Sequence, residues 1–390
     1  MNRPLDHPMD RPVAGAAVRV VVVDDSLLMR ELLQSALTEA GDITVVGTAA
    51  NPHVAREVIR ATDPDVVTLD VEMPSMGGLE FLRRIMKLRP MPVVMVAGST
   101  TSGAETTLTA LEIGAVDFVA KPSGRAGWDD FAATVRYKVR EAAKVRFDRP
   151  APPVSGLALA PTTAPAGRPP IARQGTAPAA AASGNPSASA LPYCNLIAIG
   201  ASTGGVTAIN RLLAKMPGTA PPMVIAQHMP QGFTTRFAER LARTTGLDVA
   251  EATDREVLHR GMIRMAPGNR HLRVARTGDR LICRLGDDAP VASHRPSVDV
   301  LFASVATALG KRATGVILTG MGRDGAKGLM MMRGTGAHTM GEAERSCTIY
   351  GMPKAAMQLG AVAEELEIDG LAERLLVQFV ADRAAPETTG

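Results

Sequence analysis

The chain has 390 residues, 46% of them apolar, and a formal net charge of +4 at pH 7. This length suggests two or three domains, and the apolar content excludes a wholly disordered chain. The weak charge, without a run of five like charges, and the low aromatic content (Trp 1, Tyr 3, Phe 8) argue against a nucleic-acid-binding protein, which needs a basic surface or aromatic platforms for bases.

The sequence shows no targeting or membrane-spanning pattern. Its apolar runs are strand-length, below the ~18 residues of a membrane span, and its N-terminus lacks the apolar core of a signal peptide. The three cysteines, Cys194, Cys283 and Cys347, lie far apart without metal-type spacing. We therefore expect a soluble cytoplasmic protein without structural disulfides and without membrane insertion.

Composition divides the chain into two domains. Of the 43 residues from 150 to 192, 31 are Ala, Pro, Gly or Ser, and none is aromatic or acidic. Such a stretch cannot bury enough apolar area to offset its ordering entropy. We predict a disordered N-terminal extension over 1–16, a first domain over 17–148, a flexible linker over 149–192 and a second domain over 193–385.

Strand-like and helix-like segments alternate in the first domain. Short apolar runs predict strands at 18–23, 43–46, 66–69, 93–96 and 118–120. Segments with helical periodicity predict helices at 26–40, 53–61, 78–88 and 104–113. This alternation is typical of an α/β fold with a doubly wound parallel sheet, here of five strands.

Charged side chains follow three of these strands. Asp24 and Asp25 follow the first strand, Asp70 the third and Lys121 the fifth, and ligands bind at the carboxyl ends of such parallel strands. Gathered carboxylates repel one another, so we expect a hard divalent cation such as Mg²⁺ between them. Each Asp alone could simply cap the next helix. Together with Lys121, the set suits phosphoryl transfer onto Asp70.

The first domain closely resembles the receiver domain of bacterial two-component response regulators over about residues 17–140. The matching motifs are Val23-Asp-Asp-Ser26, Asp70-Val-Glu-Met-Pro74 and Lys121-Pro122. The resemblance implies that Asp70 is phosphorylated, and that Asp25 and Asp70 hold Mg²⁺ with help from Asp24. It also implies a phosphate contact from Lys121 and a switching aromatic at Phe118.

One position departs from the receiver pattern. Receivers usually carry Ser or Thr at the end of the fourth strand, where the hydroxyl bonds the phosphoryl group, but here Val96 is followed by Ala97. A charge-assisted hydrogen bond of roughly 1.5–3 kcal/mol is then lost unless Ser99 or Thr100 replaces it. We expect a phosphorylation switch that is present but weaker than usual. Gly77, where Asp is common, is a lesser departure.

The second domain begins in the same way as the first. Apolar runs predict strands at 195–199, 223–226 and 314–318, and a helix at 206–216 follows the first of them. We predict a second, Rossmann-like parallel sheet, with an added region of short hairpins from Val249 to Cys283.

A serine lies on a glycine-rich turn between the first strand and its helix. Gly200-Ala-Ser202-Thr-Gly204 has the Gly-x-Ser-x-Gly form of a nucleophile elbow, and the helix N-terminus offers N–H groups to an oxyanion. A dinucleotide-binding fingerprint is disfavoured, because Ser202 occupies a required glycine position and no acid follows about 20 residues later. On this motif alone, a glycine turn without chemistry stays open.

Two further polar residues follow strands of the second domain. His228 follows the strand at 223–226 and Asp324 lies beyond the strand at 314–318, so both could converge on Ser202. A serine nucleophile needs a base, and a histidine base needs an acceptor that fixes its tautomer. Singly, His228 could be a surface histidine and Asp324 a turn residue. The order Ser–His–Asp disfavours a standard α/β-hydrolase. His271 and His294 follow strands less clearly.

The second domain closely resembles the catalytic domain of bacterial chemotaxis protein-glutamate methylesterases over about residues 193–380. A receiver, a linker and this domain are that family's whole architecture. The matching stretches are Gly200-Ala-Ser-Thr-Gly-Gly205, Gln227-His-Met-Pro230, Ala266-Pro-Gly268, His294-Arg-Pro-Ser-Val-Asp299, Gly315-Val-Ile-Leu-Thr-Gly-Met-Gly322 with Asp324-Gly325, and Gly351-Met-Pro353.

The resemblance implies a role for each polar residue of the second domain. Ser202 would be the nucleophile, His228 the general base and Asp324 its orienting partner. The oxyanion contacts would come from the backbone N–H of Met321 and, as a weaker candidate, of Thr203. The esterase would need no cofactor.

The resemblance also implies partners and regulation. The substrates would be glutamate γ-methyl esters, and certain glutamines, on the cytoplasmic helices of methyl-accepting chemoreceptors. A chemotaxis histidine kinase would phosphorylate Asp70, which would relieve a block of the esterase site by the receiver. We expect a monomer. A response regulator with a DNA-binding second domain is the alternative, but the chain offers no helix-turn-helix or basic recognition helix after the linker.

Overall fold

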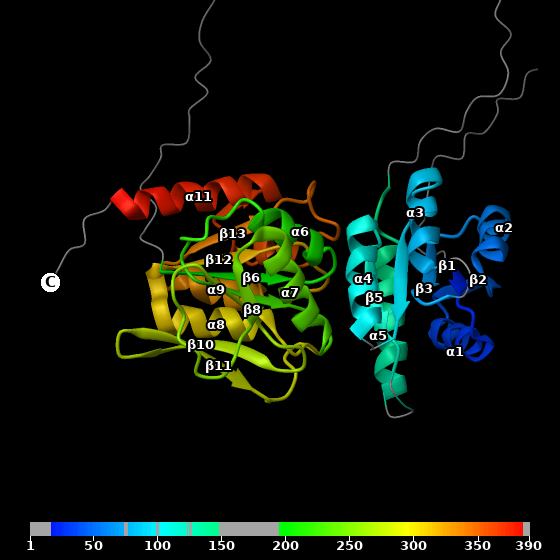
Figure 1. The fold of residues 1–390 in the computed structure, drawn as a ribbon, viewed down its shortest axis with the longest axis horizontal. Helices are drawn as coiled ribbons and strands as arrows, with labels where there is room; N and C mark the ends of the chain where they lie inside the picture. The colour runs from blue at the N-terminus through cyan, green and yellow to red at the C-terminus, as the bar shows by residue number, and fades with distance from the viewer. Residues whose placement is uncertain are drawn as a thin grey trace, which may run out of the picture.

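The computed structural model describes residues 17–73, 77–98, 101–122, 124, 127–147 and 195–384. The predicted extension over 1–16 and the predicted linker over 149–192 lie outside these residues. The described residues form two α/β domains that lie side by side, with α4, α5 and β5 of the first turned toward α6 and α7 of the second (Figure 1).

The first domain has one five-stranded sheet in the order β2-β1-β3-β4-β5, with all neighbours parallel. The strands are β1 (Val18–Val23), β2 (Ile43–Ala49), β3 (Val66–Asp70), β4 (Val93–Ala97) and β5 (Asp117–Ala120). The helices are α1 (Leu27–Thr38), α2 (Pro52–Thr62), α3 (Gly78–Leu88), α4 (Thr101–Ile113) and α5 (Trp128–Ala142). This confirms the predicted doubly wound sheet.

Helices cover both faces of this sheet because its strands are apolar on both sides. Val20 and Val22 pack with residues of α1 and α5, whereas Val21 and Val23 pack with residues of α2, α3 and α4. Successive side chains of a strand point to opposite faces, so an uninterrupted valine run serves two helical layers at once. The strand ends, which these layers leave uncovered, are where the polar residues gather.

The second domain has a seven-stranded sheet in the order β14-β13-β12-β6-β7-β9-β8, again with all neighbours parallel. The strands are β6 (Leu196–Ala201), β7 (Met223–Gln227), β8 (Asp248–Glu251), β9 (Met262–Met265), β12 (Ala313–Ile317), β13 (His338–Glu342) and β14 (Glu364–Leu366). The helices are α6 (Gly205–Leu213), α7 (Phe233–Thr245), α8 (Val298–Leu309), α9 (Ala326–Gly334), α10 (Met352–Gln358) and α11 (Ile368–Ala384). A second parallel-sheet domain is thereby confirmed.

The prediction that the whole stretch from Val249 to Cys283 forms hairpins is wrong in its first half. There β8 and β9 pair in parallel and extend the main sheet beyond β7. Their connection over 252–261 contains no helix, so the pattern that usually marks a parallel crossover is missing from the sequence. In the second half, β10 (His271–Thr277) and β11 (Arg280–Gly286) do form an antiparallel hairpin.

Apolar and charged contacts join the two domains. The rings of Phe118 in β5 and Phe233 in α7 stack with centroids 4.6 Å apart. Beside them, Arg240 of α7 donates to both carboxylate oxygens of Glu112 in α4. The first domain therefore packs against the second through the edge of its sheet that ends in β5.

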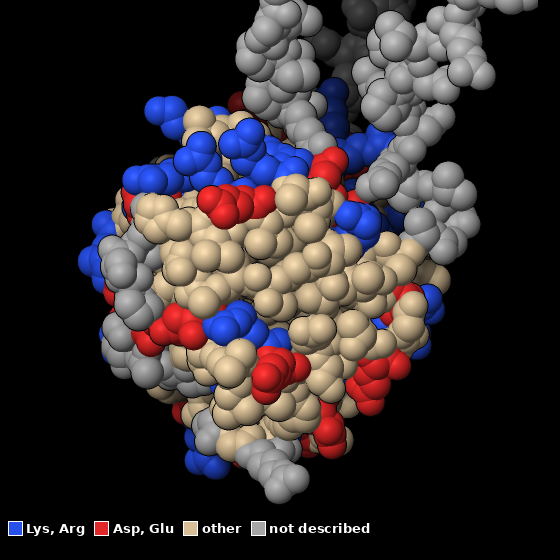
Figure 2. All heavy atoms as spheres, turned by 90° about the vertical axis from the view of Figure 1, so that its right-hand side faces the viewer, with Lys and Arg blue, Asp and Glu red and all other residues tan. Residues whose placement is uncertain are grey.

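The opposite face of the first domain carries charges of both signs. Figure 2 shows Lys and Arg side chains gathered along its upper part, with acidic side chains among and below them and a wide uncharged area between. In the described part of the chain, every helix is too short or too polar to span a lipid bilayer.

Candidate active site and phosphorylation site

Ser202 lies directly after β6, on the turn that leads into α6. Gly204 in this turn has a φ of 80°, which a glycine adopts without strain. The Ser202 backbone N–H donates to the carbonyl of Thr319 at 3.0 Å, so the turn is tied to the loop that follows β12. The Gly-x-Ser-x-Gly motif thus forms the tight strand-to-helix turn that its sequence predicts.

The loop after β12 approaches this serine closely because it contains Gly320. A Cβ atom built on Gly320 would lie 2.8 Å from the Ser202 Cβ and 2.3 Å from the Met352 sulfur. Thr319 holds the loop in place, since its hydroxyl donates to the Thr203 carbonyl at 3.0 Å and its N–H donates to buried Glu342 at 2.8 Å. Only a residue without a side chain fits between these groups.

His228 and Asp324 meet as the strand order suggests. His228 Nε2 lies 2.8 Å from Asp324 Oδ2, although the two residues are 96 positions apart. Asp324 is 1% exposed, and its oxygens also accept hydrogen bonds from the Ser297 hydroxyl and from the N–H groups of Val298 and Asp299. Burial alone would raise the pKa of Asp324, but the His228 bond and these N–H groups lower it to about 2.

The second ring nitrogen of His228 remains free to act as a base. Its Nδ1 is buried and has no hydrogen-bond partner among the described residues. Gln227 fixes the neighbouring backbone, because its side-chain amide donates to the carbonyls of Ser202 at 2.9 Å and of His228 at 3.3 Å. Ser202 and His228 line the same cavity of about 1070 Å³. This arrangement suits acyl transfer with a hydroxyl nucleophile and an imidazole base.

A second histidine, for which the sequence predicts no distinct role, lies beside this pair. The His294 ring stacks on the His228 ring with centroids 3.8 Å apart and an interplanar angle of 11°. Burial, together with the nearby His228, lowers the pKa of His294 to about 4. Its only signal in the sequence was its place in the stretch His294-Arg-Pro-Ser-Val-Asp299, which also supplies the donors to Asp324.

Known proteins match this chain along both domains. The CheB methylesterase family model matches residues 197–375, and the response regulator receiver domain model matches residues 20–128. The solved catalytic domain of a Thermotoga maritima CheB methylesterase is 32% identical and covers 47% of this chain and 98% of that chain, with a TM-score of 0.46.

Two full-length relatives decide the family. The protein-glutamate methylesterase/protein-glutamine glutaminase 1 of Caulobacter vibrioides is 48% identical over 93% of this chain and 98% of that protein. The corresponding enzyme 2 of Burkholderia thailandensis is 49% identical over 92% and 98%. The chain belongs to this methylesterase family. Its first domain is therefore a receiver domain and its second a methylesterase domain.

The receiver domain brings its predicted acidic residues and its lysine together. Ligand oxygens of Asp24, Asp25 and Asp70 lie within 4.8 Å of one another. Lys121 Nζ lies 2.9 Å from an oxygen of Asp24 and 2.9 Å from an oxygen of Asp70. Burial raises the pKa of Asp70, although Lys121 opposes this. Three carboxylates at this separation form the all-oxygen donor set that Mg²⁺ prefers, so the residues fit that ion.

Ala97 ends β4 beside this cluster, as predicted, and it is fully buried. Its carbonyl accepts a hydrogen bond of 2.7 Å from the Lys121 N–H, but its methyl group offers no donor to a phosphoryl group. Ser99 and Thr100, the suggested substitutes, lie outside the described residues. Phe118 is 3% exposed and points into the domain interface, where it meets Phe233.

The two predicted oxyanion residues lie near the candidate nucleophile. Met321 and Thr203 are both buried beside Ser202. Among the residues that the structure describes, no group accepts a hydrogen bond from the backbone N–H of either one. Both N–H groups are therefore available to donate to an oxyanion.

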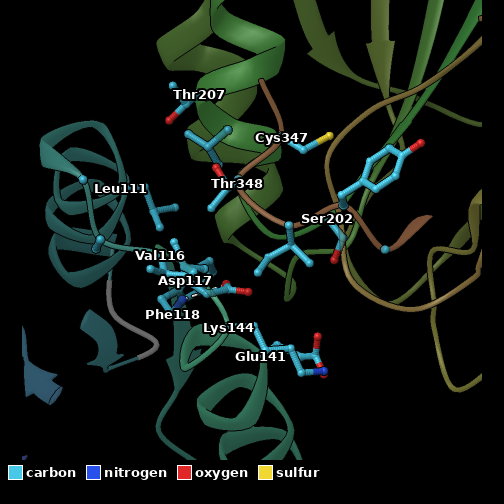
Figure 3. A pocket seen from close by; sticks show the side chains of 18 of the residues that line it. Leu111, Val116, Asp117, Phe118, Glu141, Lys144, Ser202, Thr207, Cys347 and Thr348 are labelled. Atoms are coloured by element: carbon cyan, nitrogen blue, oxygen red, sulfur yellow. Dashed lines mark hydrogen bonds and ion pairs between the residues drawn. The ribbon is translucent and has the colours of Figure 1, made fainter. Parts of the chain in front are cut away.

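The receiver domain forms one wall of the cavity that contains Ser202. Figure 3 shows Ser202 and Thr348 on the methylesterase side, facing Leu111, Asp117 and Phe118 of the receiver. The Thr203 hydroxyl donates a hydrogen bond to the Asp117 carboxylate across this boundary. The residue next to the candidate nucleophile is therefore bound directly to the receiver, a contact that the sequence could not reveal.

Proposed function

We propose that this chain hydrolyses glutamate γ-methyl esters on methyl-accepting chemoreceptors and deamidates certain receptor glutamines. In this proposal Ser202 is the nucleophile, His228 the general base and Asp324 the acceptor that orients it. The 2.8 Å contact between His228 and Asp324, beside Ser202 in one cavity, carries the proposal. The printed names of the two relatives, which give both activities, support it.

The proposed reaction uses the Ser202 hydroxyl, the Nδ1 atom of His228 and two backbone N–H groups. The Ser202 hydroxyl attacks the ester carbonyl while its proton moves to His228 Nδ1, and Asp324 stabilises the resulting imidazolium. The carbonyl oxygen gains negative charge and accepts hydrogen bonds from the N–H groups of Met321 and Thr203. His228 then returns the proton to the departing methanol. A water molecule, deprotonated by His228, releases free glutamate; with a glutamine substrate, ammonia leaves instead.

The receiver domain would regulate this reaction through Asp70. A histidine kinase would transfer a phosphoryl group onto the Asp70 carboxylate, and Lys121 would contact its oxygens. Asp24, Asp25 and Asp70 would hold Mg²⁺, which neutralises phosphoryl charge when bound. The esterase reaction itself uses side chains and backbone N–H groups alone.

Without phosphorylation, we propose that the receiver blocks the esterase. A Cβ built on Gly322, next to Met321, would lie 3.1 Å from the Tyr137 hydroxyl of the receiver's α5. The Thr203–Asp117 bond and the Phe118–Phe233 stack lie on the same side of the site. A receptor helix is about 10 Å wide, so it can reach Ser202 only when the receiver moves away.

We also propose the domain bounds, the oligomeric state and the cellular location of the protein. We assign residues 17–148 to the receiver, 149–192 to a flexible linker and 193–385 to the methylesterase domain, after a disordered extension over 1–16. Both candidate sites are complete within one chain, which supports a monomer. Its substrates would be the cytoplasmic helices of receptors, so we place the enzyme in the cytoplasm.

Methanol release from a methylated chemoreceptor tests the proposal. The wild-type chain should release methanol faster with a small phosphodonor such as acetyl phosphate and Mg²⁺. Ser202→Ala should abolish release in both conditions, whereas Asp70→Asn should keep the basal rate and lose the acceleration. A folded Ser202→Ala protein that demethylates receptors at the wild-type rate would refute the nucleophile assignment.

A further inference from the structure

His294 is the residue of the active site that the proposed reaction does not yet use. Its ring covers one face of the His228 ring, at 3.8 Å between centroids and nearly parallel to it. Its Nδ1 is buried and without a hydrogen-bond partner among the described residues. The ring therefore contacts the general base through its face, not through a hydrogen bond.

We infer that His294 is a positioning residue for the esterase reaction, whose flat neutral ring holds the His228 imidazole in plane and stabilises the imidazolium that forms there. This inference rests on the proposed function, in which His228 takes the proton of Ser202. A cation close to the face of an aromatic ring is attracted by the ring's electron density. The stack would therefore favour the protonated form of His228 that exists only during the reaction.

The charge of His294 decides whether this contact stabilises or destabilises the imidazolium of His228. A protonated His294 would repel the imidazolium of His228 at this distance. The groups that face His294 are His228, Asp324 and Lys138 of the receiver's α5, and burial is the main reason that it stays neutral near pH 7. The ring is thus available as an uncharged face near pH 7.

The backbone before His294 is arranged to present this ring. Ala292 and Ser293 both adopt left-handed conformations, with φ of 50° and 66°. The turn is closed by reciprocal hydrogen bonds between the backbones of Val291 and His294, at 2.9 and 3.1 Å. Two consecutive non-glycine residues in this region are strained, and such strain persists where the surrounding structure holds it in place.

The same segment also binds Asp324, the hydrogen-bond partner of His228. Three residues after His294, Ser297 donates its hydroxyl to Asp324 at 2.8 Å, and the Val298 N–H donates to Asp324 at 2.7 Å. One stretch of chain therefore contacts the ring face of His228 and, through Asp324, its Nε2 atom. The remaining ring nitrogen, Nδ1, is left as the base.

Three variants of the full chain separate a ring-specific role from simple filling of space. His294→Ala removes the ring, His294→Gln keeps a polar side chain without a ring, and His294→Phe keeps a flat neutral ring. We expect His294→Ala and His294→Gln to lower kcat for methanol release about five- to ten-fold with KM unchanged, the size of an aromatic or cation–π contact. His294→Phe should keep kcat within about two-fold of the wild type. His259→Ala, at an exposed histidine of the same domain, should match the wild type.

Failure of the positioning role is distinguishable from failure of the proposed function. If the wild-type chain releases no methanol, the function itself is wrong. If the wild type is active and His294→Gln is equally active, the positioning role is overturned. It is also overturned if His294→Phe is as impaired as His294→Gln while both variants melt at the wild-type temperature. The comparison of His294→Gln with His294→Phe holds even if His294→Ala fails to fold.

Discussion

The hydroxyl of Thr203 donates a hydrogen bond to the carboxylate of Asp117, and so links the two domains at the esterase site. Thr203 follows the candidate nucleophile, while Asp117 is the first residue of the receiver's last strand. Lys138 of α5 completes the group, 2.8 Å from an oxygen of Asp117 and 2.7 Å from the carbonyl of Phe118. The contact connects the strand that carries Phe118 to the turn that carries Ser202.

Removing this contact should raise the activity of the unphosphorylated enzyme. Hydrogen bonds to charged groups contribute about 1.5–3 kcal/mol, so Asp117→Ala should increase the population of open molecules about ten-fold or more. Methanol release without phosphodonor measures the change. Asp42→Ala is the matched control, because Asp42 also pairs with a basic residue of α5, Arg140, away from the interface. Equal basal rates in the two folded variants would contradict a blocking role for the interface.

Gly320 should be required for catalysis rather than for folding of the sheet. A methyl group there would collide with the Ser202 Cβ at 2.8 Å, and a displacement of about 1 Å at a reacting group can lower the rate about 100-fold. We expect Gly320→Ala to lower kcat by that order while the protein stays folded. Gly218→Ala, where a Cβ would meet nothing within 4 Å, should retain activity. Steady-state kinetics of both variants measure the expected difference in kcat.

The sequence predicted the five strands and four of the helices of the first domain, three central strands and one helix of the second, and most of the candidate site. Val18–Val23 is a buried strand because its residues pack on both sides, and such runs are visible without a structure. Ser202, His228 and Asp324 were predictable because each follows a strand of one parallel sheet. By contrast, β13 was not predicted, since His338–Glu342 mixes polar residues with one Met although most of it is buried.

Contacts between distant, non-periodic segments could not be predicted. His294 contacts His228 from a strained turn, not from the end of a strand, so no sequence pattern predicts this contact. The Thr203–Asp117 bond joins residues 86 positions apart in different domains, and it depends on how those domains pack. Similarly, β8 and β9 were mistaken for hairpin strands because their connection contains no helix.

Restoring a hydroxyl at the end of β4 should strengthen the phosphorylation switch. Ala97 is fully buried beside the Asp70 cluster, and Ala97→Ser would add one donor for a phosphoryl oxygen, worth roughly 1.5–3 kcal/mol. We expect a larger activation by acetyl phosphate, with the basal rate unchanged. The ratio of methanol release with and without phosphodonor measures it. Gly98→Ser, where a Cβ would meet nothing within 4 Å, controls for an added hydroxyl nearby; an unchanged ratio for Ala97→Ser would show that the missing hydroxyl does not limit the switch.

His294 should also make the stability of the protein depend on pH. Its pKa is lowered by burial to about 4 from an ordinary value of 6.5, so between these pH values the unfolded state binds more protons than the native state. The free energy of unfolding then falls as the pH falls through this window, by about 3 kcal/mol from this residue. His294→Phe cannot titrate, so the difference in unfolding free energy between wild type and variant should change by that amount between pH 7 and pH 4. Urea unfolding at several pH values measures it, and a pH-independent difference would mean that His294 titrates alike in both states.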